Sequence, residues 1–134
     1  QFGGWGAVFT HTDIGAPASI SVLKRSTLEH FGQVDIVINN ATVTLMGAVK
    51  DVSIEDWDTS YRVNLRRSVL LAKEFLPGVL DRRYGVFLCV SSVGQAYMGA
   101  YESFKATQLH LAETLDAELE GTGAHTFTVA PGLV

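Results

Sequence analysis

The chain has 134 residues, of which 47% are hydrophobic, and its 10 basic residues against 14 acidic ones give a formal net charge of −4. This length and apolar content suffice for one domain with a core. The acidic balance argues against nucleic acid as a partner, because a phosphate-binding surface needs clustered basic residues. No apolar run reaches membrane-spanning length, and the first residues lack the pattern of a secretion signal. The single cysteine, Cys89, excludes an internal disulfide framework and favours a reducing compartment, so we expect a cytoplasmic protein.

The beginning of the chain resembles the middle of a longer pattern. It starts at Gln1 and continues with Phe2-Gly3-Gly4, and its only methionines are Met46 and Met98. We therefore expect residues 1–134 to be the central part of a larger domain.

In the first third of the chain, the pattern predicts a strand, a helix and a second strand. Residues 7–12 are a short strand candidate that ends at Asp13. Pro17 suits the first turn of a helix that runs to Phe31, and Gly32 supplies its C-terminal stop. The mostly apolar run 34–38 is typical of a strand buried on both faces.

The rest of the chain predicts two further helix–strand units. Ser53-Ile54-Glu55-Asp56 resembles a capping box and begins a long helical region that extends to about Arg83. Pro77-Gly78 is expected to kink or interrupt this region, because proline lacks a backbone donor and clashes with the preceding turn. The elements that follow are a strand at 86–90, a helix at about 101–120 and a strand at 125–129.

This alternation predicts an α/β fold with a parallel sheet and helices on both faces. In such sheets ligands bind outside the carboxyl ends of the strands. Polar residues, or a proline and a glycine, follow each of the four predicted strands, so we expect a site at one rim of the sheet. The residues of this site are Thr12 and Asp13, Asn39 to Thr42, Ser91 and Ser92, and Pro131 and Gly132.

The spacing Tyr101-x-x-x-Lys105 places a phenol and an ammonium on one face of the predicted helix, one turn apart. An adjacent ammonium stabilises a phenolate and so lowers the pKa of the tyrosine towards the range that acid–base catalysis needs. The alternative is an ordinary surface pair, which helices provide freely.

Three further groups of polar residues each have more than one interpretation. The Asn39 and Asn40 amides either bond across to a neighbouring strand, reach a bound ribose, or close an Asx-turn. Asn64, inside a long helix, either faces solvent or distorts the helix so that a carbonyl is freed to hold a water. Ser91 and Ser92 either terminate a strand or contribute to the site.

Other candidate sites have weaker support. The four histidines lack metal-ligand spacing, so no metal is expected. Cys89 fits a small core residue rather than a nucleophile. The pairs Arg66-Arg67 and Arg82-Arg83 are interpreted as solvated helix charges.

Taken in order, these motifs resemble the short-chain dehydrogenase/reductase family over essentially the whole chain. The residues that carry the resemblance are Asp13-Ile14, Asn39-Asn40-Ala41, Asn64, Ser92, Tyr101-x-x-x-Lys105 and Pro131-Gly132. The sequence of residues 31–41 is also close to the family's usual sequence around its fourth strand. The resemblance implies a Rossmann-like, doubly wound parallel sheet that is incomplete, without the first two strands and the C-terminal region. It also implies an NAD(P)-dependent oxidoreductase that acts on a small carbonyl/alcohol substrate.

The resemblance also implies a role for each matching residue. Tyr101 would be the general acid/base, Lys105 would assist it and bond the nicotinamide ribose, and Ser92 would polarise the substrate carbonyl. Asn64 would help hold a water in the proton relay. The implied cofactor contacts are Asp13 and Ile14 at the adenine end, Asn40, Ala41 and Thr42 near the ribose, and Pro131 and Gly132 near the nicotinamide. The choice between NAD and NADP stays open.

The chain departs from the family pattern in three ways. The segment from Ser92 to Tyr101 is several residues shorter than usual, which leaves the choice between Ser91 and Ser92 open. Thr42 stands where glycine is usual. The opening strand and its glycine-rich turn, which hold the pyrophosphate, are absent.

Two functions from different classes follow. The first is the oxidoreductase; the alternative is a non-catalytic remnant or interaction module on the same scaffold. The resemblance also implies a homodimer or homotetramer, because the helices at 54–83 and 101–120 have wide apolar faces, which include Leu65, Val69, Leu70, Leu109, Ala112 and Leu115. The other interpretation is that both faces pack on the chain's own sheet.

Overall fold

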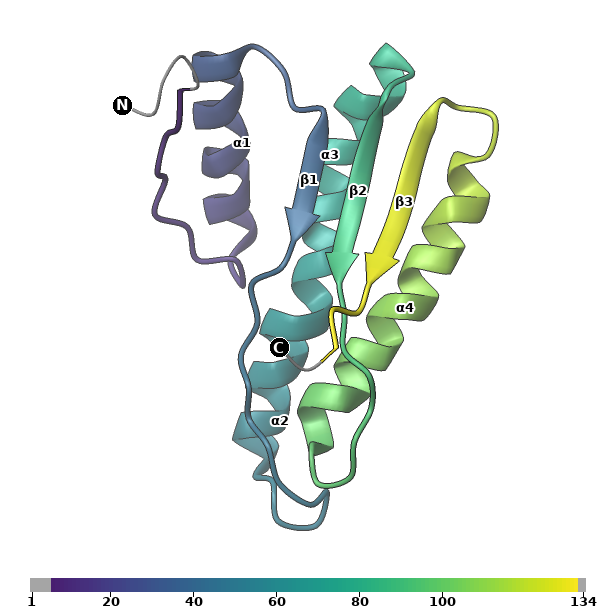
Figure 1. Ribbon diagram of the computed structural model, residues 1–134. Helices are drawn as coiled ribbons and strands as arrows, with labels where there is room; N and C mark the ends of the chain where they lie inside the picture. Colours follow the sequence, from purple (N-terminus) through teal and green to yellow (C-terminus); the bar gives the residue numbers. More distant parts are fainter. Residues whose placement is uncertain (1–5, 133–134) are drawn as a thin grey trace.

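A computed structural model describes residues 6–132, which form a three-stranded parallel sheet and the helices that connect its strands (Figure 1). The strands β1 (Ile36–Asn39), β2 (Gly85–Val90) and β3 (Ala124–Val129) are ordered β1-β2-β3. Ile36 lies opposite Val86, and Gly85 lies opposite Ala124. The predicted α/β class and parallel pairing are confirmed, and all three carboxyl ends lie at one rim.

The first helix, α1 (Pro17–Phe31), begins and ends where the sequence predicts. Pro17 occupies its first turn. At its end Gly32 adopts φ 80°, a left-handed conformation that glycine takes without steric cost, and its N–H donates to the Leu28 carbonyl.

The long helical region is continuous, although it contains a change of winding. It consists of α2 (Ile54–Ser60), the π-helical turn η1 (Tyr61–Arg66) and α3 (Arg67–Arg82). The Ser53 hydroxyl caps it by accepting a hydrogen bond from the Asp56 N–H at 3.0 Å, as the capping box predicts. The expected interruption at Pro77 is wrong, because α3 runs through this residue. Pro77 lies on the exposed side of α3, while Phe75 and Val79 are buried on the other side and hold the helix against the core.

The last helix, α4 (Gly99–Leu119), presents the Tyr101 and Lys105 pair from its first two turns. Its start needs glycine. Gly99 has φ 37°, and a Cβ added there would lie 2.6 Å from the Gly47 carbonyl oxygen. This close approach fixes the N-terminus of α4 beside the segment that follows β1.

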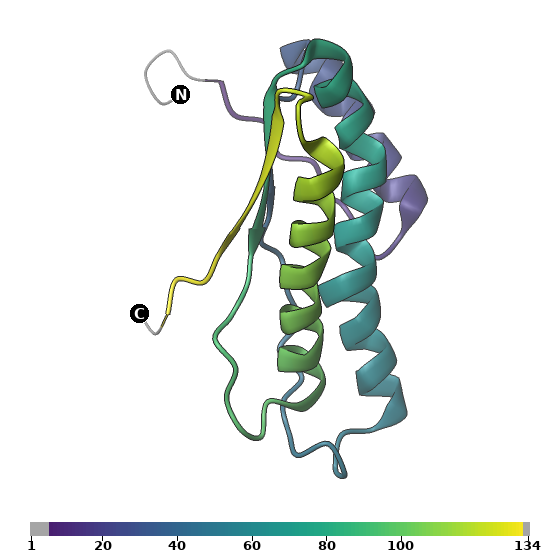
Figure 2. The same cartoon turned by 90° about the vertical axis from the view of Figure 1, so that its right-hand side faces the viewer.

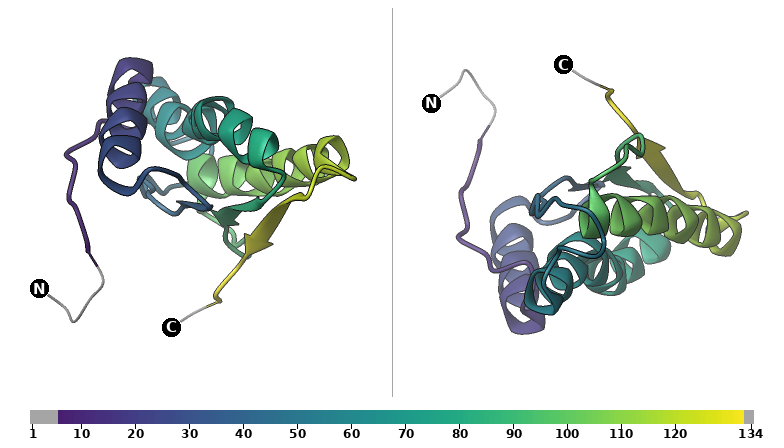
Figure 3. Two further views of the ribbon diagram at one scale, coloured as in Figure 1. Left: turned by 90° about the horizontal axis from the view of Figure 1, so that it is seen from above. Right: turned by 90° about the horizontal axis from the view of Figure 1, so that it is seen from below.

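The core lies between the sheet and the helices. Its main cluster contains Ile20 from α1, Leu71, Ala72 and Phe75 from α3, Phe87 and Cys89 from β2, and Leu115 from α4. In the described residues the helices cover only one face of the sheet (Figure 2), and Figure 3 shows α1, α3 and α4 side by side there. The expectation of helices on both faces is therefore wrong for this part of the fold. The opposite face leaves large apolar side chains exposed, among them Ile36, Ile38, Phe127 and Val129.

The predicted strand at 7–12 does not form. The segment runs beside α1, where the Thr10 and Ser26 hydroxyls lie 3.4 Å apart, and Phe9 is 88% exposed (Figure 1). A strand needs a hydrogen-bonded neighbour, and the sheet places no strand beside this segment. Within residues 6–132, no helix is long and apolar enough to cross a membrane.

Candidate active site

A cavity of about 250 Å³ opens at the carboxyl ends of the three strands; we call it the strand-end cavity. Three of the four predicted strand-end segments meet there, each directly after its strand. The lining residues are Asn40, Thr42, Val90, Ser91, Ser92, Val93, Gln95, Met98, Tyr101, Lys105, Pro131 and Gly132. The parallel topology therefore brings most of the predicted site residues together.

Tyr101 and Lys105 face the same cavity from α4. The Lys105 Nζ lies 5.9 Å from the centre of the Tyr101 ring and donates a hydrogen bond to the Val90 carbonyl oxygen at 2.7 Å. Lys105 is only 2% exposed, and burial lowers its pKa. The positive charge of Arg67 lowers this pKa further, whereas Cys89 and Glu102 act to raise it. An ammonium has three donors, so protons of Lys105 beyond the Val90 bond can serve a ligand in the cavity.

The two serines after β2 have different surroundings. Ser91 is 8% exposed, and its hydroxyl donates to the backbone carbonyl of Lys105 at 3.0 Å. Ser92 is half-buried, and its hydroxyl donates to Oε1 of Glu102 at 2.6 Å. Ser91 therefore ties β2 to α4, while Ser92 is joined to a titratable side chain.

Asn64 lies in the π-helical turn and is fully buried. Its Oδ1 accepts from the Thr42 hydroxyl at 2.8 Å and from the Val43 N–H at 2.9 Å, and its Nδ2 donates to the Val43 carbonyl at 2.8 Å. Its own carbonyl accepts a hydrogen bond from Nε2 of Gln108. The distortion of the helix is present, but Asn64 does not line the strand-end cavity; it shapes the cavity by holding the segment that contains Thr42.

The two asparagines at the end of β1 separate into a core residue and a site residue. Asn39 is 1% exposed, and its Nδ2 donates to the Ser68 hydroxyl at 2.7 Å and to Sγ of Cys89, on the neighbouring strand, at 3.6 Å. Asn40 is exposed and lines the strand-end cavity.

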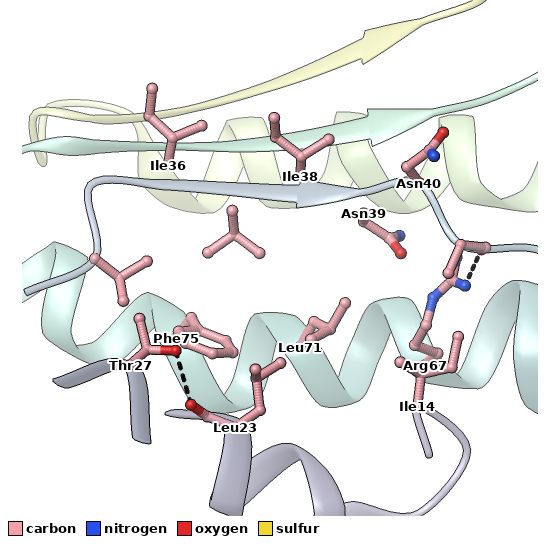
Figure 4. A pocket seen from close by; sticks show the side chains of 13 residues that line it. Ile14, Leu23, Thr27, Ile36, Ile38, Asn39, Asn40, Arg67, Leu71 and Phe75 are labelled. Carbon is pink, nitrogen blue, oxygen red and sulfur yellow. Dashed lines mark hydrogen bonds between the residues drawn. The ribbon is translucent and has the colours of Figure 1, made fainter. Parts of the chain in front are cut away.

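Asn40 also lines a second cavity of about 270 Å³, between α1 and β1 (Figure 4). Ile14 and Ala41 lie in its wall, so these two predicted contacts are brought to a space that shares a residue with the strand-end cavity. Asp13 lines neither cavity. Its Oδ1 accepts from the Gly15 N–H at 2.9 Å, which closes a turn immediately before Ile14.

The interpretation of Arg66-Arg67 as a solvated pair is wrong for Arg67. Its side chain is fully buried and lines the second cavity, where it donates to the Ala41 carbonyl (Figure 4). Burial lowers the pKa of Arg67 to about 10, with the charge of Cys89 acting in the opposite direction. The cause is helix phase, since position 67 faces the sheet whereas Arg66 remains partly exposed.

Two contributors at this site were missed by the sequence reasoning. Gln108 is fully buried and bridges α4 to the π-helical turn, donating to Asn64 and to the Ser68 hydroxyl. Glu102 reaches Ser92 across the loop. The one feature of the sequence that could have indicated a role for Glu102 is its position directly after Tyr101. Among residues 6–132, no three metal-ligating side chains gather as a metal site would require.

Comparison with known proteins shows which family the chain resembles. A family model described as short chain dehydrogenase matches residues 3–134. A subunit of (2S)-[(R)-hydroxy(phenyl)methyl]succinyl-CoA dehydrogenase from Thauera aromatica is 31% identical over 125 residues, which is 91% of this chain and 50% of that protein. An uncharacterized oxidoreductase from Staphylococcus epidermidis is 28% identical, over 91% of this chain and 55% of its own length. The chain thus spans about half the length of these relatives.

Solved structures agree with the family match. A short-chain dehydrogenase/reductase from Burkholderia phymatum in complex with NAD superposes with a TM-score of 0.90 at 26% identity, over 95% of this chain and 48% of that one. A metagenomic short-chain oxidoreductase in complex with NADP gives 0.89 at 26% identity, over 98% and 62%.

Proposed function

We propose, from the premise that this chain belongs to the short-chain dehydrogenase family of oxidoreductases, that it carries the proton-transfer site of an NAD(P)-dependent enzyme acting on a carbonyl/alcohol pair. The observation that carries the proposal is the shared cavity. Tyr101, Lys105 and Ser92 line one space at the carboxyl ends of the strands, together with Asn40, Pro131 and Gly132. That rim is where open α/β sheets bind ligands.

In this proposal Tyr101 is the general acid/base. It gives a proton to the substrate oxygen during reduction and takes it back during oxidation. The buried ammonium of Lys105 stabilises negative charge on the phenol oxygen. Ser92, rather than Ser91, contacts the substrate oxygen, because Ser92 is the more exposed of the two and its hydroxyl bonds a side chain, Glu102, whereas the Ser91 hydroxyl is tied to the backbone carbonyl of Lys105. Asn64 acts indirectly, because its side chain positions Thr42 at the cavity.

The residues present fit a nicotinamide dinucleotide, which supplies the hydride when bound. Lys105 has donors beyond its Val90 bond for a ribose, and the exposed Asn40, Pro131 and Gly132 leave open backbone at the rim. In the second cavity Ile14 offers an apolar wall for the adenine end, and Ala41 lies near the ribose. Asp13 closes the turn immediately before Ile14. NAD and NADP are both compatible with these contacts.

We also propose that residues 1–134 are part of a larger dinucleotide-binding domain in a cytoplasmic protein that forms a homodimer or homotetramer. The chain's half-length match to its relatives supports the first point. The assembly is supported by partly exposed apolar side chains on η1 and α3, namely Leu65, Val69 and Leu70. In contrast, Ala112 and Leu115 are buried in the chain's own fold. A monomeric mass for the full-length product in solution would contradict the assembly.

The function is tested on the full-length product that carries these residues. It is incubated with NADH or NADPH and a panel of small ketones, here cyclohexanone, acetophenone and ethyl acetoacetate, while cofactor absorbance is followed. Ketone-dependent oxidation of either cofactor is expected, together with saturable thermal stabilisation by that cofactor. The absence of both turnover and thermal stabilisation at millimolar cofactor would favour the non-catalytic scaffold instead.

A further inference from the structure

Glu102 is joined to the strand-end cavity by its hydrogen bond with Ser92. The Ser92 Oγ lies 2.6 Å from Oε1 of Glu102, and Ser92 lines the cavity whereas Glu102 does not. A separation of 2.5–2.7 Å is typical of a hydroxyl that donates to an ionised carboxylate. An ionised carboxylate accepts hydrogen bonds and donates none, so the proton in this contact belongs to Ser92.

This contact decides what Ser92 offers to a ligand. A hydroxyl has one proton and two lone pairs, so a serine that donates to Glu102 presents lone pairs to the cavity. A substrate carbonyl oxygen is itself an acceptor, so it finds no donor at Ser92 in this arrangement. Ser91 does not substitute, because its proton goes to the Lys105 carbonyl. Ser92 must therefore turn its proton from Glu102 towards the substrate oxygen before it can polarise a carbonyl.

We propose that Glu102 is a positioning residue that holds the Ser92 proton outside the cavity and thereby restrains the reaction. The inference rests on the proposed function, in which Ser92 contacts the substrate oxygen. When Ser92 turns to the substrate, its lone pair faces an ionised carboxylate, which is unfavourable. A glutamine at position 102 removes this penalty, because its amide can turn an N–H towards the Ser92 oxygen. The proton stays covalently bound to Ser92 throughout.

The sign of the predicted effect separates it from a structural role. Glu102→Gln is expected to raise the single-turnover rate of cofactor oxidation by cyclohexanone about tenfold, the equivalent of about 1.4 kcal/mol and of one hydrogen bond. The effect should appear mainly in kcat, since the bond strengthens as charge develops on the oxygen. Glu113→Gln removes a charge from the exposed part of the same helix and should leave the rate unchanged.

The charge of Glu102 also acts on Lys105, so a double-variant cycle is needed. In a Ser92→Ala background, Glu102→Gln should have no effect on the rate if Glu102 acts through Ser92. The same tenfold rise in both backgrounds would assign the effect to Tyr101 and Lys105 directly. A fall in rate when Glu102→Gln is made in the protein that retains Ser92 would assign Glu102 a structural role. Either result overturns the proposal.

A second measurement does not depend on turnover. In isotopically labelled full-length protein, the NMR amide shift of Ser92 should follow the protonation of the Glu102 side-chain carboxyl, and this response should vanish in Glu102→Gln. A Ser92 amide that ignores the Glu102 titration overturns the inference. An unreactive wild type with a responsive Ser92 would instead count against the proposed oxidoreductase function alone.

Discussion

Lys105 combines nearly complete burial with a positive charge, and the fold holds it through a single backbone acceptor, Val90. Its neighbours work in opposite directions, since burial and Arg67 disfavour the ammonium while Glu102 and Cys89 favour it. Such a group costs the folded state free energy whenever it is protonated. A residue kept at this cost beside Tyr101 is typical of a functional site, where perturbed groups concentrate.

This cost predicts a pH dependence of stability. Because the pKa of Lys105 is lowered in the folded chain, the unfolded chain binds more protons between that lowered pKa and 10.5, so unfolding becomes less favourable as pH rises there. The unfolding free energy of wild type relative to Lys105→Met should therefore be larger at pH 10 than at pH 7. Urea denaturation of both proteins at the two pH values measures this difference. A wild-type advantage that stays constant or shrinks towards pH 10 would contradict the lowered pKa.

At the residue scale, strand-end positions are predictable from sequence and side-chain partners are not. Asn40, Ser92 and Pro131 could be placed at one rim because parallel strands bring their carboxyl ends together. The burial of Arg67 could not be predicted, since helix phase relative to the sheet depends on packing that residue type does not reveal. The Ser92–Glu102 bond spans a loop whose path no local pattern specifies.

At the scale of elements, local signals located the helix ends well but misjudged what packing tolerates. The Ser53 cap and the Gly32 stop are set by short-range hydrogen bonds and backbone geometry, and both are confirmed. Pro77 was expected to kink or interrupt the helix, yet α3 is uninterrupted there, and the buried Phe75 and Val79 hold it against the core. The segment 7–12 has strand composition, but a strand forms only where a neighbour offers backbone partners.

The uninterrupted course of α3 predicts that Pro77 is a local weakness. Pro77→Ala should stabilise the chain by about 1–3 kcal/mol, because alanine restores an N–H to the helix and removes the ring's clash with the preceding turn. Denaturation midpoints of the variant and the wild type provide the measurement. Destabilisation by Pro77→Ala would contradict this expectation and show that proline is favourable at this position of α3.

At the scale of the whole molecule, the helices within residues 6–132 cover one face of the sheet and leave the other face uncovered. On the uncovered face, Ile36 and Ile38 are each 60% exposed and Phe127 is 53% exposed. Exposed apolar surfaces of this kind mark interaction sites or aggregation hazards. The half-length match to the relatives fits the proposal that residues 1–134 are part of a larger domain.

The bare face predicts the behaviour of the 134-residue chain in solution. It should bind the dye ANS and self-associate, and the double substitution Ile38→Thr with Phe127→Thr should lower both signals, because each change removes apolar surface from the uncovered face. Val22→Thr, at an exposed position on α1, is the matched control and should change neither. Dye fluorescence and sedimentation measure the two effects. Equal signals in the double variant and the wild type would show that another surface binds the dye and mediates self-association.

The central claim is that Tyr101 transfers the proton in the strand-end cavity, and single-turnover cofactor oxidation in the full-length product tests it most directly. Tyr101→Phe keeps the ring and removes the hydroxyl, so the hydride-transfer rate should fall by about 10²-fold or more while cofactor affinity is retained. Tyr97→Phe, at a 78% exposed position in the neighbouring loop, should leave the rate unchanged. Undiminished turnover by Tyr101→Phe would contradict the assignment of this cavity as the catalytic site.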